Sequence, residues 1–239
     1  MNVAIIVAAG QGTRMDGERP KQFLELAGVP VIVHTLRRFE QCATIDACIV
    51  VLPALETSSF LTIAEQYKLR KLTRIVAGGA TRTESVARGL QTIQSAKAGI
   101  IAVHDGVRPF VRPAEIDQTV RAAETSGAAV LVAPVVDTIK EVLGDQLTRT
   151  LPREQLRRAL TPQCFRYELL CRAYEHARAH KLDTTDCSAL VEQLGVPITT
   201  IAGDPRNIKL TRPEDLALAE ILLREFEQES KVQSPKSNV

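Results

Sequence analysis

Short runs dense in Val, Ile and Ala alternate with segments of helical periodicity through the first half of the chain. The apolar runs span residues 3–9, 47–52, 73–78, 99–105 and 128–135. Helical patterns lie between them, near 30–41, 56–68, 83–95 and 113–126. A continuous apolar run suits a strand that is buried on both faces, as in a parallel sheet. The alternation therefore predicts an α/β fold: a Rossmann-like three-layer sandwich around a mainly parallel sheet.

After Pro134 the pattern changes. Residues 137–156 alternate in short strand-like pieces around Gly144 and Asp145, which together are a turn signal. This pattern predicts a β-hairpin arm that projects from the sheet. The elements expected after the arm are helices near 166–180 and 186–194, a strand at 198–203 and a last helix.

The last helix is predicted to start at Thr211, because Glu214 three residues later would complete a capping box. Residues 229–239 are polar and are predicted to form a disordered tail. A chain of 239 residues that is 45% hydrophobic can bury one substantial core. We therefore expect a single domain over residues 1–228 that contains the arm.

Charge and composition argue against several classes of protein. The net charge is only +2 and aromatic residues make up 4%, so neither the basic face nor the stacking residues of a nucleic-acid binder are expected. The apolar stretches are too short to cross a membrane, and the first residues lack the basic segment of a secretion signal. The five cysteines show no C-x-x-C spacing and fit reduced thiols, which predicts a cytoplasmic protein.

A glycine-rich, cationic segment, residues 7–23, follows the first predicted strand. Gly10 and Gly12 would let backbone N–H groups close on an anion, and Arg14 and Lys21 supply positive charge. The segment lacks the third glycine of a dinucleotide-binding loop and the Gly-Lys-Ser/Thr of a Walker loop. The carboxyl end of a parallel strand is where open α/β sheets bind ligands. On this segment alone, anion binding and a solvated turn both remain open.

Several further segments carry a resemblance to a known family. The opening reads AAGQGTRM and then PKQFLELAGVPVIVHTL. The similarity continues in GGATRTESVARGL (78–90), VHDGVRPFV (103–111), DTIK (137–140), ALTPQCF (159–165), TDCSAL (185–190) and NIKLTRPEDLALAE (207–220). In this order and spacing, over about residues 2–225, the segments resemble the 2-C-methyl-D-erythritol 4-phosphate cytidylyltransferases of the non-mevalonate isoprenoid pathway.

The resemblance implies transfer of CMP from CTP to a polyol phosphate, with release of pyrophosphate. The residues implied to act on the reacting phosphates are Arg14, Lys21, Arg153 and Lys209. Those implied to line the nucleotide site are Ala8, Ala9, Gly10, Gly12, Gly79, Arg82, Ser85 and Asp105. Those implied around the second substrate are Arg108, Thr138, Arg153, Thr161, Thr185 and Lys209. Asp105, at the end of a predicted strand, is a suitable ligand for Mg²⁺, the expected cofactor.

The predicted arm suggests a dimer. A two-stranded ribbon is marginal alone in water, so its apolar residues need a surface to pack against. Two chains that exchange arms about a two-fold axis would provide it. The resemblance implies such a homodimer, in which Thr138 and Arg153 complete the partner's site. Two alternatives stay open: a ribitol-5-phosphate cytidylyltransferase, and a non-catalytic nucleotide-binding relative.

Overall fold

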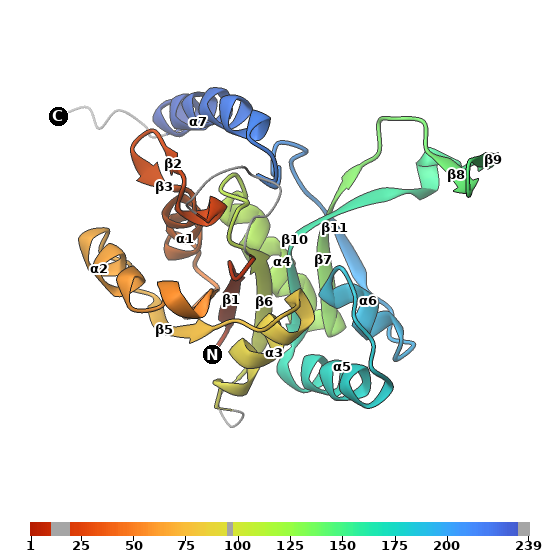
Figure 1. The fold of residues 1–239 in the computed structure, drawn as a ribbon, viewed down its shortest axis with the longest axis horizontal. Helices are drawn as coiled ribbons and strands as arrows, with labels where there is room; N and C mark the ends of the chain where they lie inside the picture. Colours follow the sequence, from red (N-terminus) through yellow and green to blue (C-terminus); the bar gives the residue numbers. More distant parts are fainter. Residues whose placement is uncertain (11–19, 95–97, 234–239) are drawn as a thin grey trace.

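The structure, a computed structural model, describes residues 1–10, 20–94 and 98–233. Within these ranges a seven-stranded sheet runs in the order β11-β7-β10-β6-β1-β4-β5 (Figure 1). Its strands are β1 (Val3–Val7), β4 (Ala47–Leu52), β5 (Leu72–Ala77), β6 (Ile100–Asp105), β7 (Ala128–Pro134), β10 (Arg157–Arg166) and β11 (Thr199–Ala202). Neighbouring strands are parallel except at β10, which is antiparallel to both β6 and β7. The predicted, mainly parallel sheet is confirmed.

Strand β10 was missed in the sequence because Pro162 interrupts its apolar pattern. Proline cannot donate to a strand ladder, and in a sheet it is confined to edges, strand starts and bulges. The ladder between β10 and β7 shifts register between Ala159 and Gln163, so Pro162 lies in that irregularity. The strand can therefore continue through the middle of the sheet despite the proline.

Helices cover both faces of the sheet (Figure 1). Helices α1 (Val31–Glu40), α2 (Ser59–Gln66) and α4 (Pro113–Ser126) pack on one face, and α3 (Arg82–Gln91), α5 (Tyr167–His180) and α6 (Cys187–Glu192) pack on the other. Successive side chains of a strand point to opposite faces. Accordingly Ile6 of β1 packs in the first cluster and Ile5 in the second. The predicted three-layer sandwich is confirmed.

The predicted hairpin arm is also present. Strand β8 (Lys140–Leu143) pairs antiparallel with β9 (Gln146–Thr150), and Gly144 takes a φ of +58° in the turn between them. Figure 1 shows the pair standing away from the central sheet. A second, two-residue hairpin, β2 (Glu25–Leu26) with β3 (Val29–Pro30), leads into α1 and was not predicted.

The last helix, α7, differs from its prediction at both ends. It spans Glu214–Gln233. Its N-terminus is capped by Asp215, whose carboxylate accepts hydrogen bonds from the backbone N–H and the hydroxyl of Thr211. The predicted capping partner, Glu214, was therefore wrong by one residue. The predicted tail boundary at 229 is corrected as well, because Glu229 lies within the helix and pairs with Arg112 and Arg206. Residues 234–239 lie outside the described residues.

Helix α7 packs against residues that follow β1 and β6. Its Leu222, Leu223 and Phe226 form a third apolar cluster with Leu26 and Phe110.

Over the described ranges, none of the helices has both the length and the apolar character needed to cross a membrane. The sheet and its two helical layers thus form one framework, on which the loops at the carboxyl ends of the strands are held.

Candidate active site

A cavity of about 280 Å³ opens where β1 and its neighbours end. In register, Val7 lies beside Val51 of β4 and beside Asp105 of β6, so these parallel strands end at the same edge of the sheet. The chain continues from β1 to β4 on one side and later to β6 on the other, which makes this edge a topological switch point. The predicted site residues that line the cavity are Ala8, Ala9, Gly10, Lys21, Gly79, Arg82, Ser85, Asp105 and Lys209.

Small residues allow the backbone segments to converge at this edge. The backbone N–H of Ala8 donates to the carbonyl of Val51 at 2.8 Å, and that of Gly106 donates to the carbonyl of Val7 at 2.8 Å. A Cβ added to Gly106 would lie 2.8 Å from the Cβ of Ala8, which is closer than real Cβ atoms approach. Glycine is therefore required at position 106 by the close approach of the two strand ends.

Asp105 gathers three cationic side chains at the cavity. Its Oδ1 lies 3.4 Å from Nε of Arg82, and its Oδ2 lies 3.2 Å from Nε of Arg108 and 3.1 Å from Nζ of Lys209. Burial by itself would raise the pKa of Asp105, but the nearby charges of Arg82, Lys209 and Arg108 outweigh it and hold that pKa well below its usual range. The carboxylate is therefore ionised, and the cluster keeps an excess of positive charge.

His104 and Thr161 support this carboxylate from inside the sheet. His104 is fully buried, its Nε2 is 3.1 Å from the carbonyl of Arg108, and its Nδ1 is 3.0 Å from the Thr161 hydroxyl. A carbonyl only accepts, so Nε2 carries the proton and the hydroxyl donates to Nδ1. The same hydroxyl accepts the backbone N–H of Asp105 at 3.3 Å. Burial lowers the pKa of His104 to about 4, so the ring is neutral.

Thr161 is not among the described residues that line the cavity. The resemblance implied a substrate contact, yet the side chain is buried and its hydroxyl is engaged with His104 and Asp105. In the structure Thr161 lies behind Asp105 and is bonded to the backbone N–H of that residue. The role of His104 was missed in the sequence, where the only signal was its position directly before Asp105 at the end of an apolar run.

A buried sulfur holds the other side of Arg82. The Nη1 of Arg82 donates to Cys187 Sγ at 3.4 Å, and the hydroxyl of Tyr174 lies 3.2 Å from the same sulfur. The backbone N–H of Cys187 donates to Gln163 Oε1 at 2.9 Å. Arg82 is thus held between Asp105 on one side and Cys187 on the other, with its guanidinium beside the cavity.

The N-terminus of α3 forms one wall of the cavity. Thr81 caps the helix, since its hydroxyl accepts the backbone N–H of Glu84 at 3.1 Å. The Ser85 hydroxyl donates to the Thr81 carbonyl at 2.8 Å and accepts the N–H of Gly79 at 3.1 Å. Ser85 therefore orients the Gly79 backbone beside the cavity, where a helix N-terminus favours an anion.

Some predicted site residues lie elsewhere. Thr138 and Arg153 belong to the arm, are exposed, and are not among the described residues that line the cavity; Arg153 Nη1 donates to the carbonyl of Val136 at 3.1 Å. Thr185 is exposed in the turn before α6. Arg108 pairs with Asp105 but is not among the described residues that line the cavity; its Nη1 donates to the carbonyl of Asn207 at 2.8 Å. Gly12 and Arg14 lie outside the described residues.

The residues present can hold a divalent cation only with help from a ligand. Among the described residues, no three His, Cys, Asp or Glu side chains gather in a way that could hold a metal, and Asp105 is the one carboxylate lining this cavity. Magnesium commonly takes one or two protein carboxylates and completes its shell with phosphates and water. Asp105 fits that pattern as a single protein ligand.

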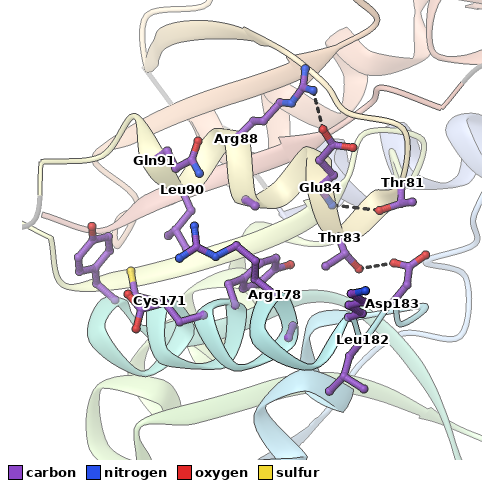
Figure 2. Close-up of a pocket in the computed structure, with 16 residues that line it drawn as sticks. Thr81, Thr83, Glu84, Arg88, Leu90, Gln91, Cys171, Arg178, Leu182 and Asp183 are labelled. Atoms are coloured by element: carbon purple, nitrogen blue, oxygen red, sulfur yellow. Dashed lines mark hydrogen bonds and ion pairs between the residues drawn. The ribbon is translucent and has the colours of Figure 1, made fainter.

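A larger cavity, about 740 Å³, lies between α3 and α5 (Figure 2). Figure 2 shows the hydroxyl of Thr83 directed at the carboxylate of Asp183, a hydrogen bond of 2.7 Å that joins α3 to the loop after α5. None of the predicted site residues lines this cavity. Tyr174 lines it and also contacts Cys187, so this cavity adjoins the contacts that hold Arg82.

Comparison with known proteins identifies the family and supports the fold. The family model for 2-C-methyl-D-erythritol 4-phosphate cytidylyltransferase matches residues 2–225. A protein of that name from Acidobacterium capsulatum is 44% identical, over 92% of this chain and 96% of its own length. Another, from Halalkalibacterium halodurans, is 42% identical, over 94% of this chain and 97% of its own length. The crystal structure of the Thermus thermophilus enzyme is similar with a TM-score of 0.75 and 36% identity, covering 94% of this chain and all of that one. A synthase structure from Anaerococcus prevotii has a TM-score of 0.83 at 29% identity, over 93% and 96% of the two chains.

Proposed function

The chain belongs to the 2-C-methyl-D-erythritol 4-phosphate cytidylyltransferase family, and from this premise we propose how its residues carry out the transfer of CMP. The enzyme acts in non-mevalonate isoprenoid biosynthesis. A phosphate oxygen of 2-C-methyl-D-erythritol 4-phosphate attacks the α-phosphorus of CTP. The new P–O bond forms while the bond from that phosphorus to the oxygen bridging to the β-phosphate breaks. Pyrophosphate leaves with the bonding electrons, and 4-diphosphocytidyl-2-C-methyl-D-erythritol remains.

The observation that carries the proposed site is the gathering of Arg82, Arg108 and Lys209 at Asp105 beside the cavity. Both substrates are anions, so the protein has to bring like charges together and stabilise more charge as the reaction proceeds. Fixed cations next to the reacting phosphates do this at little reorganisation cost. We assign Lys21 and Arg14 to the triphosphate, and Lys209 to the region where the two phosphates meet.

The nucleotide is proposed to enter the cavity at the switch point. Ala8, Ala9 and Gly10 would face it through their backbones, and Gly79 and Ser85 would form the opposite wall. Magnesium is proposed as the cofactor, and when bound next to Asp105 it would neutralise phosphate charge as a Lewis acid. The low pKa of Asp105 supports this role, because the carboxylate stays ionised at any pH at which the enzyme works.

We propose that the enzyme is a homodimer in the cytoplasm and that the arm completes the partner's site. Val142, Leu143 and Leu147 of the arm are 61%, 79% and 58% exposed, which is a large apolar surface for so short a hairpin. Pairing of arms about a two-fold axis would cover it and carry Thr138 and Arg153 to the second site. All five cysteines are free thiols, which supports a reducing compartment.

A substrate assay tests the proposed activity. The purified protein is given CTP, magnesium and either 2-C-methyl-D-erythritol 4-phosphate or ribitol 5-phosphate, and pyrophosphate release is followed. We expect release with the first acceptor and a much lower rate with the second, and we expect a chelator to abolish both. Equal or faster turnover of ribitol 5-phosphate would reassign the acceptor. Full activity in the chelator would remove magnesium from the proposal.

A further inference from the structure

Gln22 is a buried polar residue whose amide nitrogen is unsatisfied within the described part of the chain. It is 1% exposed, it lines the 280 Å³ cavity, and its Nε2 has no hydrogen-bond partner among the residues described. Buried polar groups in folded proteins are almost always paired, so each exception needs an explanation. The segment to which Gln22 belongs is the one that supplies Lys21 to the same cavity.

The local structure holds Gln22 in this position. Lys21–Phe23 forms a single 3-10 turn, in which the Phe23 N–H donates to the Pro20 carbonyl at 2.9 Å. Phe23 is buried, and its ring lies 6.1 Å from that of Phe60. The buried Phe23 ring therefore anchors the backbone of this turn, and with it the position of the Gln22 Cα at the cavity wall.

We propose that Gln22 is a nucleotide-binding residue, whose Nε2–H donates to an acceptor oxygen of bound CTP. This inference rests on the proposed function, because it takes the cavity to be the CTP site. Ligand sites combine apolar walls with a few placed polar groups, and near Gln22 this cavity offers Ala8, Ala9 and Val107 as the apolar part. Among the described residues the donor has no other partner, so in the complex the CTP oxygen would supply the hydrogen bond that these residues do not.

Substitution of Gln22 by Met separates this role from a structural one. Methionine has a similar length and volume and no donor, so Gln22→Met removes the proposed bond with little change in packing. We expect the Kd for CTP, measured by calorimetry with magnesium present, to rise about tenfold. We expect the melting temperature without nucleotide to stay the same or rise, because the substitution removes a buried donor that has no partner among the described residues. Gln91→Met is the matched control, since Gln91 is exposed and lines the other cavity.

Repeating the titration with cytidine and with tripolyphosphate shows which part of CTP, the nucleoside or the triphosphate, contains the acceptor oxygen. It is the part whose affinity falls in Gln22→Met. An unchanged Kd for CTP in the variant overturns the proposal. A melting temperature lower by more than about 3 °C also overturns it, because Gln22 would then have a partner within the protein itself. Failure of the wild-type protein to bind CTP at all would instead contradict the proposed function.

Discussion

Asp105 sets the electrostatics of the site because it faces three cations while only 9% of its side chain is exposed. Without it, Arg82, Arg108 and Lys209 would repel one another beside the cavity. With it, they remain close together and still leave a net positive charge for phosphates. The carboxylate is therefore proposed to have two roles, as a support for these cations and as a ligand for magnesium.

His104, directly behind Asp105, predicts a pH dependence of stability. Its pKa is lowered from 6.5 to about 4 by burial, so between these values the unfolded chain binds a proton that the folded chain does not. The contribution of His104 to the free energy of unfolding is therefore fully present above about pH 6.5. It is lost as the pH drops toward 4, by up to about 1.4 kcal/mol per pH unit for this one proton. His34, whose pKa burial also lowers, adds to the slope in the same direction.

The variant His104→Gln tests this assignment. Glutamine can still bond the Arg108 carbonyl and the Thr161 hydroxyl but takes up no proton. Urea unfolding at about pH 7 and about pH 5 gives the loss of unfolding free energy for each protein. We expect a smaller loss in the variant than in the wild type, whatever the variant's stability at pH 7. Equal losses in the two proteins would mean that His104 is not the titrating group.

The arm is the element whose surface most needs a partner. Val142 and Leu147 are directly opposed in the β8–β9 ladder, so their side chains share one face of the hairpin. Both are more than half exposed. So exposed an apolar pair buries little surface within its own chain, which is why we propose that it belongs to a dimer interface.

The double variant Val142→Thr, Leu147→Thr removes this apolar pair while keeping residues that favour strands. We expect the dimer dissociation constant, measured by sedimentation equilibrium, to rise at least about a hundredfold, because each lost side chain occurs twice in a symmetric dimer. The matched control is Leu55→Thr, Leu61→Thr, which changes two exposed leucines outside the arm. If both double variants associate as the wild type does, the arm is not the interface.

The whole molecule is proposed to build each site from two chains. Lys21 lines the cavity, whereas Arg153 lies in the arm. If Arg153 acts in the partner's site, then a mixed dimer of Lys21→Ala and Arg153→Ala chains has one intact site and one site with both lesions. Random pairing makes about half of the dimers mixed, so activity should return to about a quarter of wild type.

Subunit exchange has to be shown separately, for example by energy transfer between labelled chains. Each variant alone should be nearly inactive, and a mixture of two batches of the same variant is the control. Recovery near a quarter supports the shared site. No recovery despite proven exchange would place Arg153 in the site of its own chain and leave the dimer itself untouched.

Local patterns were enough to predict most of the fold. The buried parallel strands have continuous apolar runs, and the hairpin turn is marked by Gly144 and Asp145, so both kinds of element were predicted close to their observed bounds. Two of the failures have local causes. Pro162 concealed β10, and two adjacent acidic residues, Glu214 and Asp215, left the cap of α7 ambiguous. Strand order was not predicted, because it depends on contacts between elements far apart in the chain.

The sequence by itself determined the fold class, the arm and, through its motifs, most of the residues around the cavity. Only the tertiary structure decided how these residues act on one another. Asp105 meets Arg82 and Lys209 because β6 ends beside β1 and the later chain returns to that edge. The same convergence places Thr161 behind Asp105 and Cys187 against Arg82, and it buries Gln22 without a partner among the described residues. Periodicity reports which way a side chain faces within its own element, whereas burial and charge pairing arise from sheet register and layer packing.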